Sequence, residues 1–290
     1  MFATKVAVGS LVVLTLGIAI AVRIGGSSWD RSVAALEARI KTGRRAAQRL
    51  AQEDLPSPVR RYLAGAVPEH AEQIVEARLT QKGTFQMGEG PAGWRPFTAV
   101  EVFRASDPAF YWDARIAMAP GVPVRVLDSY IDGEARMLGK ILSLVPVVDA
   151  SAEPGLLRGA LARYLAEAVW IPTRLVSGPE LTWEAIDDWS AEATLHNRDT
   201  TVSLTFTFSY DGDPLEVRGI RAREVDGEYI DTPWLGRFSD HRSVDGFRIP
   251  TYGEVAWIVD GDEVLYWRGT ITSAEFATEQ ARYADSPSAP

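Results

Sequence analysis

The segment Thr201–Tyr210, TVSLTFTFSY, alternates between apolar and hydroxyl-bearing side chains along its whole length. Alternation with a period of two is typical of an antiparallel strand that has one buried face and one polar face. This segment therefore predicts that the chain folds as a mainly β protein. Its apolar face consists of Val202, Leu204, Phe206, Phe208 and Tyr210.

Runs of similar character recur along the chain and predict about ten strands, some of them merged. Five Asp-Gly pairs lie between residues 132 and 261, and such pairs are hairpin signals when alternating runs flank them. Because the strands do not alternate with helices, a doubly wound fold is excluded. The predicted strands lie near residues 75–87, 97–105, 109–118, 123–131, 135–142, 181–188, 191–197, 200–210, 214–225, 234–244, 247–259 and 263–273.

Residues 154–169 form the one substantial helix expected inside the β region, and a shorter one is expected over Val59–Ala66. Pro154 suits a first helical turn, since proline has no N–H to satisfy there. Pro172 prevents the longer helix from continuing. The helix carries an apolar stripe, so we expect it to plug or cover a curved sheet. The stripe consists of Leu157, Leu161, Tyr164, Leu165 and Ala168.

The first residues of the chain predict a transmembrane helix. The run Val6–Val22, VAVGSLVVLTLGIAIAV, is apolar or small throughout and is flanked by Lys5 and Arg23. Seventeen residues is the short end of the range for a membrane-spanning helix. A cleaved signal peptide ending near Ala21 is the alternative. We therefore expect residues 1–24 to be a membrane anchor.

Residues 25–54 are expected to form a basic helical stalk. Val33, Leu36 and Ile40 lie on one side of a helix over residues 30–53, which could instead lie on lipid headgroups. Two prolines then mark a boundary in the segment DLPSP. The β domain is expected over residues 55–278, followed by a disordered tail over residues 279–290.

Charge is distributed unevenly along the 290 residues. Residues 1–53 carry eight basic and three acidic side chains, a balance of +5, whereas the whole chain has a net charge of −9, so residues 54–290 hold −14. An acidic domain repels phosphate backbones, so no nucleic-acid partner is expected. A basic arm beside an apolar segment suits an anionic membrane surface. We expect a membrane-anchored protein whose folded domain is extracytoplasmic.

Four stretches together carry a resemblance to a known family: RYLAEAVWIPTRL from Arg163, LTWEAIDDWSAEATL from Leu181, GFRIPTYGEVAW from Gly246 and YWRGTI from Tyr266. Their order resembles an uncharacterised bacterial family of often membrane-tethered proteins. Members of that family look like the lipoprotein-carrier-like (LolA/LolB-like) half-barrels. The resemblance covers most of residues 55–275 and implies a strongly curved antiparallel sheet wrapped around one internal helix. The wider half-barrel group includes carriers of acyl chains and a pigment-pathway enzyme.

Two carboxylates are candidates for a site. Asp187 shares a strand face with Trp183 if the strand is regular, and burial between indoles would raise its pKa. Alternatively, Asp187 belongs to a hairpin turn. Glu167 lies one helical turn after Arg163 and shortly before Trp170, and a structural ion pair is the alternative to a site there.

Three further residues are candidates on the last strands. His241 could move protons near neutral pH. Glu254 and Trp257 lie in a hairpin where cross-strand aromatic packing is the structural alternative to a ligand cavity. No metal site is expected, because the spacing of the three histidines suggests no common site and the chain has no cysteine. No cofactor is expected, because no Gly-rich phosphate loop is followed by a helix and lysine.

These observations favour a membrane-anchored protein that binds a lipid or another apolar small molecule in a tryptophan-rich cavity. The residues expected to contact the ligand are charged or aromatic: Arg163, Glu167, Asp187, His241, Glu254, Trp170, Trp183 and Trp257. One alternative is an enzyme that uses Glu167 or Asp187 with an arginine in the same cavity. The other is a non-catalytic envelope interaction module, which would have an exposed apolar patch and no cavity.

Overall fold

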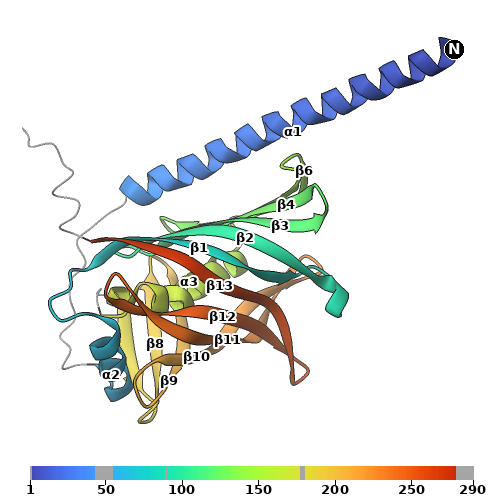
Figure 1. Ribbon diagram of the computed structural model, residues 1–290. Coiled ribbons are helices and arrows are strands. Elements are labelled where there is room, and N and C mark those ends of the chain that lie inside the picture. The colour runs from blue at the N-terminus through green and yellow to red at the C-terminus, as the bar shows by residue number, and fades with distance from the viewer. Residues whose placement is uncertain (1, 43–54, 89, 177–179, 279–290) are drawn as a thin grey trace, which may run out of the picture.

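The computed structural model describes residues 2–42, 55–88, 90–176 and 180–278, with side chains described from residue 16 onward. Thirteen strands of these residues form one antiparallel sheet, which curls around a central helix (Figure 1). The predicted mainly β half-barrel wrapped around an internal helix is therefore confirmed. The strands are β1 (Ile74–Gln86), β2 (Trp94–Arg104), β3 (Ala109–Ala119), β4 (Val122–Ile131), β5 (Glu134–Ile141), β6 (Val145–Ser151), β7 (Leu181–Ala185), β8 (Ser190–Asn197), β9 (Thr200–Phe208), β10 (Pro214–Val225), β11 (Glu228–Val244), β12 (Phe247–Val259) and β13 (Asp262–Thr278).

The sheet consists of two meanders that meet at its centre. The strand order is β6-β5-β4-β3-β2-β1-β13-β12-β11-β10-β9-β8-β7, so the first and last strands of the chain are neighbours. Their backbones approach closely where Gly83 lies opposite Gly269. A Cβ atom on Gly83 would collide with the carbonyl oxygen of Arg268, so glycine is required at this crossing.

Strand β6 is the one strand of the described residues that the pattern analysis did not predict. Pro146 interrupts its sequence, VPVVDAS, and proline lacks the N–H that a central strand needs. In the structure β6 lies at the edge of the sheet, beside β5, where that missing donor is tolerated. Its valines Val145, Val147 and Val148 are exposed.

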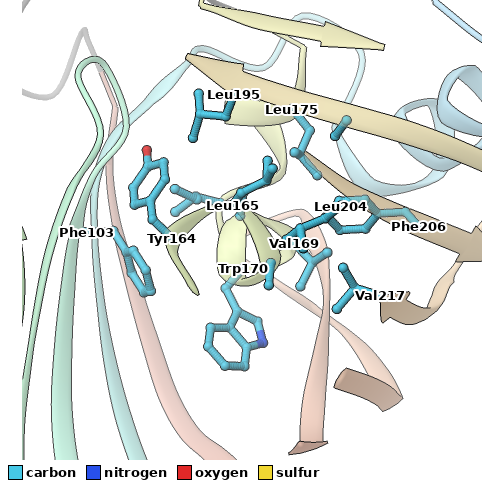
Figure 2. Packing of buried hydrophobic residues seen from close by; sticks show 14 of the residues in the cluster. Phe103, Tyr164, Leu165, Val169, Trp170, Leu175, Leu195, Leu204, Phe206 and Val217 are labelled. Carbon is cyan, nitrogen blue, oxygen red and sulfur yellow. The ribbon is translucent and has the colours of Figure 1, made fainter. Parts of the chain in front are cut away.

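Helix α3 (Pro154–Glu167) connects the two meanders and lies inside the curl. It continues into the short 3-10 turns η3 (Ala168–Trp170) and η4 (Pro172–Leu175), so the predicted helix ends about where Pro172 requires. Its apolar side chains pack against both meanders, as Figure 2 shows for Tyr164 beside Phe103 and for Val169 beside Val217. The predicted helix α2 (Ser57–Ala66) packs at the end of the barrel near β8, β9 and β12.

Helix α1 (Phe2–Thr42) places its C-terminal part on the outer face of the sheet, opposite α3, and its N-terminal part projects beyond the sheet (Figure 1). Trp29 and Ile40 are buried there against Val102, Tyr111 and neighbouring side chains of β2–β5. The predicted stripe of Val33, Leu36 and Ile40 thus packs on the sheet, whereas a solvated stalk or an interfacial helix would leave it outside the domain. The helix docks there because the outward-facing positions of these strands also carry apolar side chains, which alternate with the inward-facing ones.

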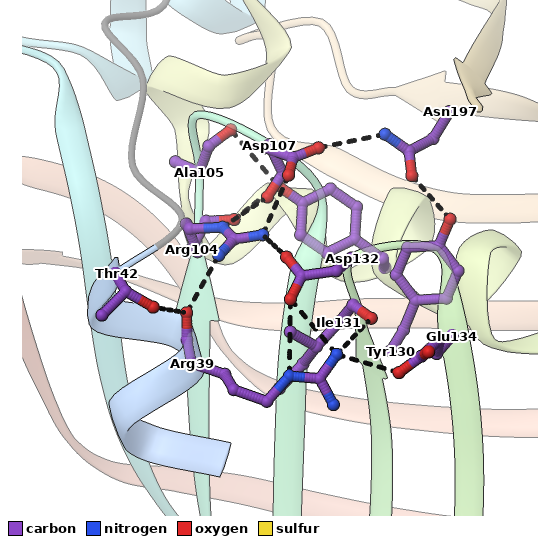
Figure 3. Close-up of polar contacts among 11 residues, drawn as sticks. Arg39, Thr42, Arg104, Ala105, Asp107, Tyr130, Ile131, Asp132, Glu134 and Asn197 are labelled. Atoms are coloured by element: carbon purple, nitrogen blue, oxygen red, sulfur yellow. Dashed lines mark hydrogen bonds and ion pairs between the residues drawn. The ribbon is translucent and has the colours of Figure 1, made fainter. Parts of the chain in front are cut away.

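Polar contacts fix the end of α1 to the sheet (Figure 3). The fully buried Arg104 donates hydrogen bonds to the carbonyl oxygen of Arg39 at 3.1 Å and to the carboxyl group of Asp132 at 3.0 Å. Arg39 itself forms ion pairs with Asp132 and Glu134. The guanidinium of a strand residue therefore holds the C-terminal end of α1.

Within the described residues, no helix is long and apolar enough to cross a bilayer. Residues 6–15 of the run that predicted a transmembrane helix lie outside the residues whose side chains are described. The predicted transmembrane helix therefore has no support in the described part of the chain. Residues 43–54 of the predicted stalk and the predicted tail over 279–290 also lie outside it.

Candidate functional site

A cavity of about 380 Å³ lies between α3 and the inner face of the sheet. Side chains of β3–β6 form one wall, those of β10–β13 form the other, and α3 forms the inner boundary. The lining is mostly apolar, and its aromatic members are Phe85, Trp112, Trp170, Tyr229, Trp234, Phe238, Trp257, Tyr266 and Trp267. A second, wider hollow of about 1240 Å³ lies between α1, β5 and the start of α3, and none of the predicted site residues lines it.

A row of polar side chains crosses the inner face of the first meander. Glu101 on β2 pairs in register with Trp112 on β3, which pairs with Asp128 on β4. Gln81 on β1 completes the row: its Nε2 donates to Glu101 Oε2 at 2.6 Å, and its Oε1 accepts from Trp112 Nε1 at 2.8 Å. Strand register therefore brings these residues together, although they are far apart in sequence.

Arg163 projects from α3 onto this row and binds three carboxyl groups. Its Nη2 lies 2.6 Å from Glu101 Oε1, its Nη1 lies 2.8 Å from Asp128 Oδ2, and its Nε lies 2.9 Å from Glu167 Oε1. The guanidinium also lies 5.3 Å from the ring centre of Trp112, within the range of a cation–π contact. The carboxyl cluster is defined here as Glu101, Asp128 and Glu167 with Arg163.

Burial makes two carboxyl groups of the cluster harder to ionise. Burial, reinforced by the charge of Glu167, raises the pKa of Glu101 well above its ordinary value, and burial also raises the pKa of Glu167. Burial opposes the charge of Arg163, but its carboxyl partners outweigh that effect and raise its pKa. The guanidinium therefore stays charged, whereas the two glutamates keep their protons to a higher pH than an exposed carboxyl group does.

Two polar atoms in the cavity lining are buried without a hydrogen-bond partner in the described structure. They are Asp128 Oδ1 and Arg221 Nε. Arg221 lies on β10, where its guanidinium is 4.7 Å from the ring centre of Trp234 and its Nη2 donates to the carbonyl oxygen of Gly159 at 2.9 Å. The lining thus contains one unpaired acceptor and one unpaired donor.

Comparison with known proteins identifies the family. The profile described as "Family of unknown function (DUF6920)" matches residues 53–276. The chain belongs to the DUF6920 family. This match confirms the expected resemblance to an uncharacterised family. No curated protein sequence matches this DUF6920 chain significantly.

Two solved structures are similar to this DUF6920 chain. One is a LolA superfamily protein from Nitrosomonas europaea, with 9% identity over 76% of this chain and 92% of that chain, and a TM-score of 0.39. The other is a β-barrel-like protein of domain of unknown function DUF1849 from Brucella abortus, with 12% identity over 71% of this chain and 100% of that chain, and a TM-score of 0.22. At these scores, any functional conclusion for the DUF6920 chain rests on its own cavity.

Five of the eight sequence-predicted site residues line the cavity: Arg163, Glu167, Trp170, Glu254 and Trp257. Trp170 is held by a hydrogen bond from its Nε1 to the carbonyl oxygen of residue 250. Trp257 stacks on the ring of residue 266 at 5.6 Å, and Glu254 lies 3.5 Å from the guanidinium of residue 237. The structure thus brings together the helix candidates and the candidates of β12.

The other three predicted residues, Trp183, Asp187 and His241, do not line this cavity. Trp183 donates from Nε1 to a carbonyl oxygen of η4 and packs against a core phenylalanine. Asp187 Oδ1 accepts the backbone N–H groups of residues 189 and 190, so turn chemistry places it in a hairpin rather than between indoles. His241 Nε2 donates to the carbonyl oxygen of Pro214, and burial lowers its pKa.

The sequence reasoning missed Gln81, Glu101, Asp128 and Arg221. A usable signal exists for two of them, because each is the polar member of an otherwise apolar face. Glu101 is in phase with the inward-facing Phe97, Ala99 and Phe103, and Asp128 is in phase with Val124 and Val126. Among the described residues, no group of three or more histidine, aspartate or glutamate side chains is arranged to hold a metal ion.

Proposed function

We propose that this protein binds an apolar small molecule, such as a lipid chain, in the cavity between α3 and the sheet. The observation that carries the proposal is a mostly apolar, aromatic-lined cavity of about 380 Å³ between the central helix and the inner face of the sheet. Protein interiors normally leave few voids larger than a water molecule. This volume falls in the range of small-molecule sites, which are typically apolar with a few placed polar groups.

We further propose that residues 1–24 anchor the chain in a membrane with the folded domain on the extracytoplasmic side. Leu16, Ile18, Ile20 and Ile24 of α1 are 51–63% exposed and continue the apolar run that begins at residue 6. Gly25 packs against the turn that precedes β6. Two exposed valines of β6 itself, Val147 and Val148, also line the cavity. A bilayer that covers this apolar surface would lie beside the cavity wall.

An enzyme that uses Glu167 is the second candidate. Glu167 lines the cavity with a raised pKa, as a general acid requires. The same carboxyl group is engaged by Arg163 and Glu101, which also suits a static role. The third candidate, a non-catalytic interaction module, was expected to have no cavity, so the cavity counts against it. The exposed valines of β6 are the feature that favours it, since they could contact a partner.

The proposal is tested by native mass spectrometry of the full chain, purified from its own membranes in mild detergent. We expect a bound species of lipid mass that dissociates when the protein unfolds. Val126 lines the cavity on β4, so Val126→Trp fills it and should remove the bound mass. Val122→Trp makes the same change at an exposed position of the same strand and should retain it.

An unliganded mass for the wild-type chain, repeated after incubation with lipid extract, would overturn the binding proposal. Loss of the bound species from both tryptophan variants would also count against the cavity as its location. Circular dichroism of both variants checks that they fold. If the wild type is unliganded, a screen for turnover that depends on Glu167, with Glu167→Gln as the comparison, addresses the enzyme candidate.

A further inference from the structure

Asp128 lines the cavity and carries a buried acceptor without a partner in the described structure. The residue is 5% exposed and lies on β4, in register with Trp112 and Met137. Its Oδ2 accepts from Arg163 Nη1 at 2.8 Å, whereas Oδ1 has no hydrogen-bond partner in the described structure. A buried polar atom without a partner costs free energy, so native structures rarely retain one unless water or a ligand satisfies it.

The neighbouring side chains do not supply the missing donor. Arg163 directs Nε to Glu167, Nη1 to Asp128 Oδ2 and Nη2 to Glu101. The indole N–H of Trp112 is engaged by Gln81. The remaining neighbour in register, Met137, has no donor. Neither Arg163 nor Trp112 therefore donates to Asp128 Oδ1 in the described structure.

Charge in the cluster selects against an anionic ligand. Three carboxyl groups surround the one guanidinium of Arg163, so the cluster itself has no excess of positive charge. Arg221 contributes a positive charge that acts on Glu167 from the opposite wall. Two guanidinium groups thus face three carboxyl groups at the polar end of the cavity, which leaves no excess positive charge to attract an anion. Glu224, Glu254 and Arg237, the other charged groups of the lining, add one further negative charge.

Arg221 supplies a second requirement. Its Nε is buried without a partner, and the guanidinium is held between the rings of Trp234 and Trp257 and the carbonyl oxygen of Gly159. The polar end of the cavity therefore needs both a donor for Asp128 and an acceptor for Arg221. A hydroxyl group provides both, and neighbouring hydroxyl and carbonyl groups would do the same.

We infer that the ligand is a neutral, hydroxyl-bearing lipid whose head donates a hydrogen bond to Asp128 Oδ1 and offers an oxygen to Arg221 Nε. The inference rests on the proposed function, because it assigns the polar end of the same ligand. A fatty acid lacks the donor when ionised and places a negative charge beside the carboxyl cluster. An alkylammonium ion has donors but no acceptor for Arg221.

The test compares four probes of equal chain length: dodecanol, dodecylamine, dodecanoic acid and dodecane. The full chain in nanodiscs is loaded with the neutral fluorophore N-phenyl-1-naphthylamine, and each probe is titrated as a competitor at pH 7. We expect dodecanol to compete at least about tenfold more tightly than dodecanoic acid, the factor expected for a hydrogen bond to a charged group. It should also compete more tightly than the amine and the alkane.

The variant Asp128→Asn separates recognition from general apolar binding. An asparagine whose oxygen keeps the bond to Arg163 turns its amide N–H toward the cavity, so the preference for dodecanol over dodecanoic acid should fall to about onefold. Asp231→Asn is the matched control, because Asp231 forms an exposed ion pair with Arg158 and does not line the cavity. It should keep the wild-type preference.

The outcomes distinguish the two proposals. Competition by dodecanoic acid or dodecylamine that equals or exceeds that of dodecanol would overturn the inference about the head while leaving apolar binding intact. An unchanged preference in Asp128→Asn would also overturn it. If none of the probes displaces the fluorophore and native mass spectrometry finds no bound lipid, the proposed function itself fails.

Discussion

Arg163→Met should destabilise the barrel strongly and in a pH-dependent way. Arg163 binds Glu101, Asp128 and Glu167 at 2.6–2.9 Å, and its side chain is 18% exposed. Methionine fills much of the same space but leaves these carboxyl groups without their cation. Removing one partner of a buried ion pair typically costs about 3–5 kcal/mol. For a domain of this size, each kcal/mol corresponds to roughly 2–4 °C in Tm.

The loss of stability should depend on pH, which distinguishes a loss of charge compensation from a loss of packing. At pH 8 the carboxyl groups of the variant face each other with too little compensating positive charge. At pH 5 they take up protons more readily, so the loss of stability should shrink. Urea denaturation of the full chain at both pH values, followed by tryptophan fluorescence, measures the difference.

Arg158→Met is the matched control, because Arg158 lies on the same helix but forms an exposed ion pair with Asp231. Exposed pairs typically contribute about 0–1 kcal/mol. The reasoning fails if Arg163→Met costs no more than Arg158→Met, or if its cost is the same at pH 5 and pH 8. Either result would mean that the carboxyl cluster does not depend on the guanidinium.

Two further predictions concern other parts of the molecule. The pKa of Glu101 is raised in the folded state, which therefore holds more protons than the unfolded state, and wild-type stability should fall as pH rises above the ordinary glutamate pKa. In urea denaturation, the free energy of unfolding of Glu101→Gln should fall less than that of the wild type between pH 5 and pH 8. An equal fall in both proteins would contradict this. Trp29→Ala should undock α1 at a cost of about 3–5 kcal/mol, since Trp29 is 2% exposed and donates to Asp113. Amide hydrogen exchange over residues 29–40 should accelerate without a change in α3, and unaltered exchange would show that docking does not depend on this indole.

Local patterns were sufficient to predict most of the fold. Alternation identified the strands other than β6, where Pro146 broke the pattern at a sheet edge that tolerates proline. Proline placement and an apolar stripe identified α3. The docking of α1 was missed, because a helix that covers the outer face of a sheet and a solvated helix can carry similar stripes.

Only the helix residues of the carboxyl cluster could be predicted from the sequence. Arg163 and Glu167 were found because a helical turn makes them neighbours. Glu101 and Asp128 become their neighbours only through strand register and the curl of the sheet, which no local pattern specifies. For Asp187 the sequence left two interpretations open, a strand face between indoles and a hairpin turn, and its carboxyl group accepts hydrogen bonds in a turn.

The pairing of β1 with β13 has a consequence for how the protein is made. These strands lie at opposite ends of the domain sequence, yet they join the two meanders at the centre of the sheet. Contacts so distant in sequence are slow to form, because a long loop must close first. During synthesis the first meander emerges with one edge of β1 unpaired, and the two meanders join only when residues 262–278 have left the ribosome. Until then a long strand edge is open to wrong partners, so nascent chains that stall before β13 should depend on chaperones.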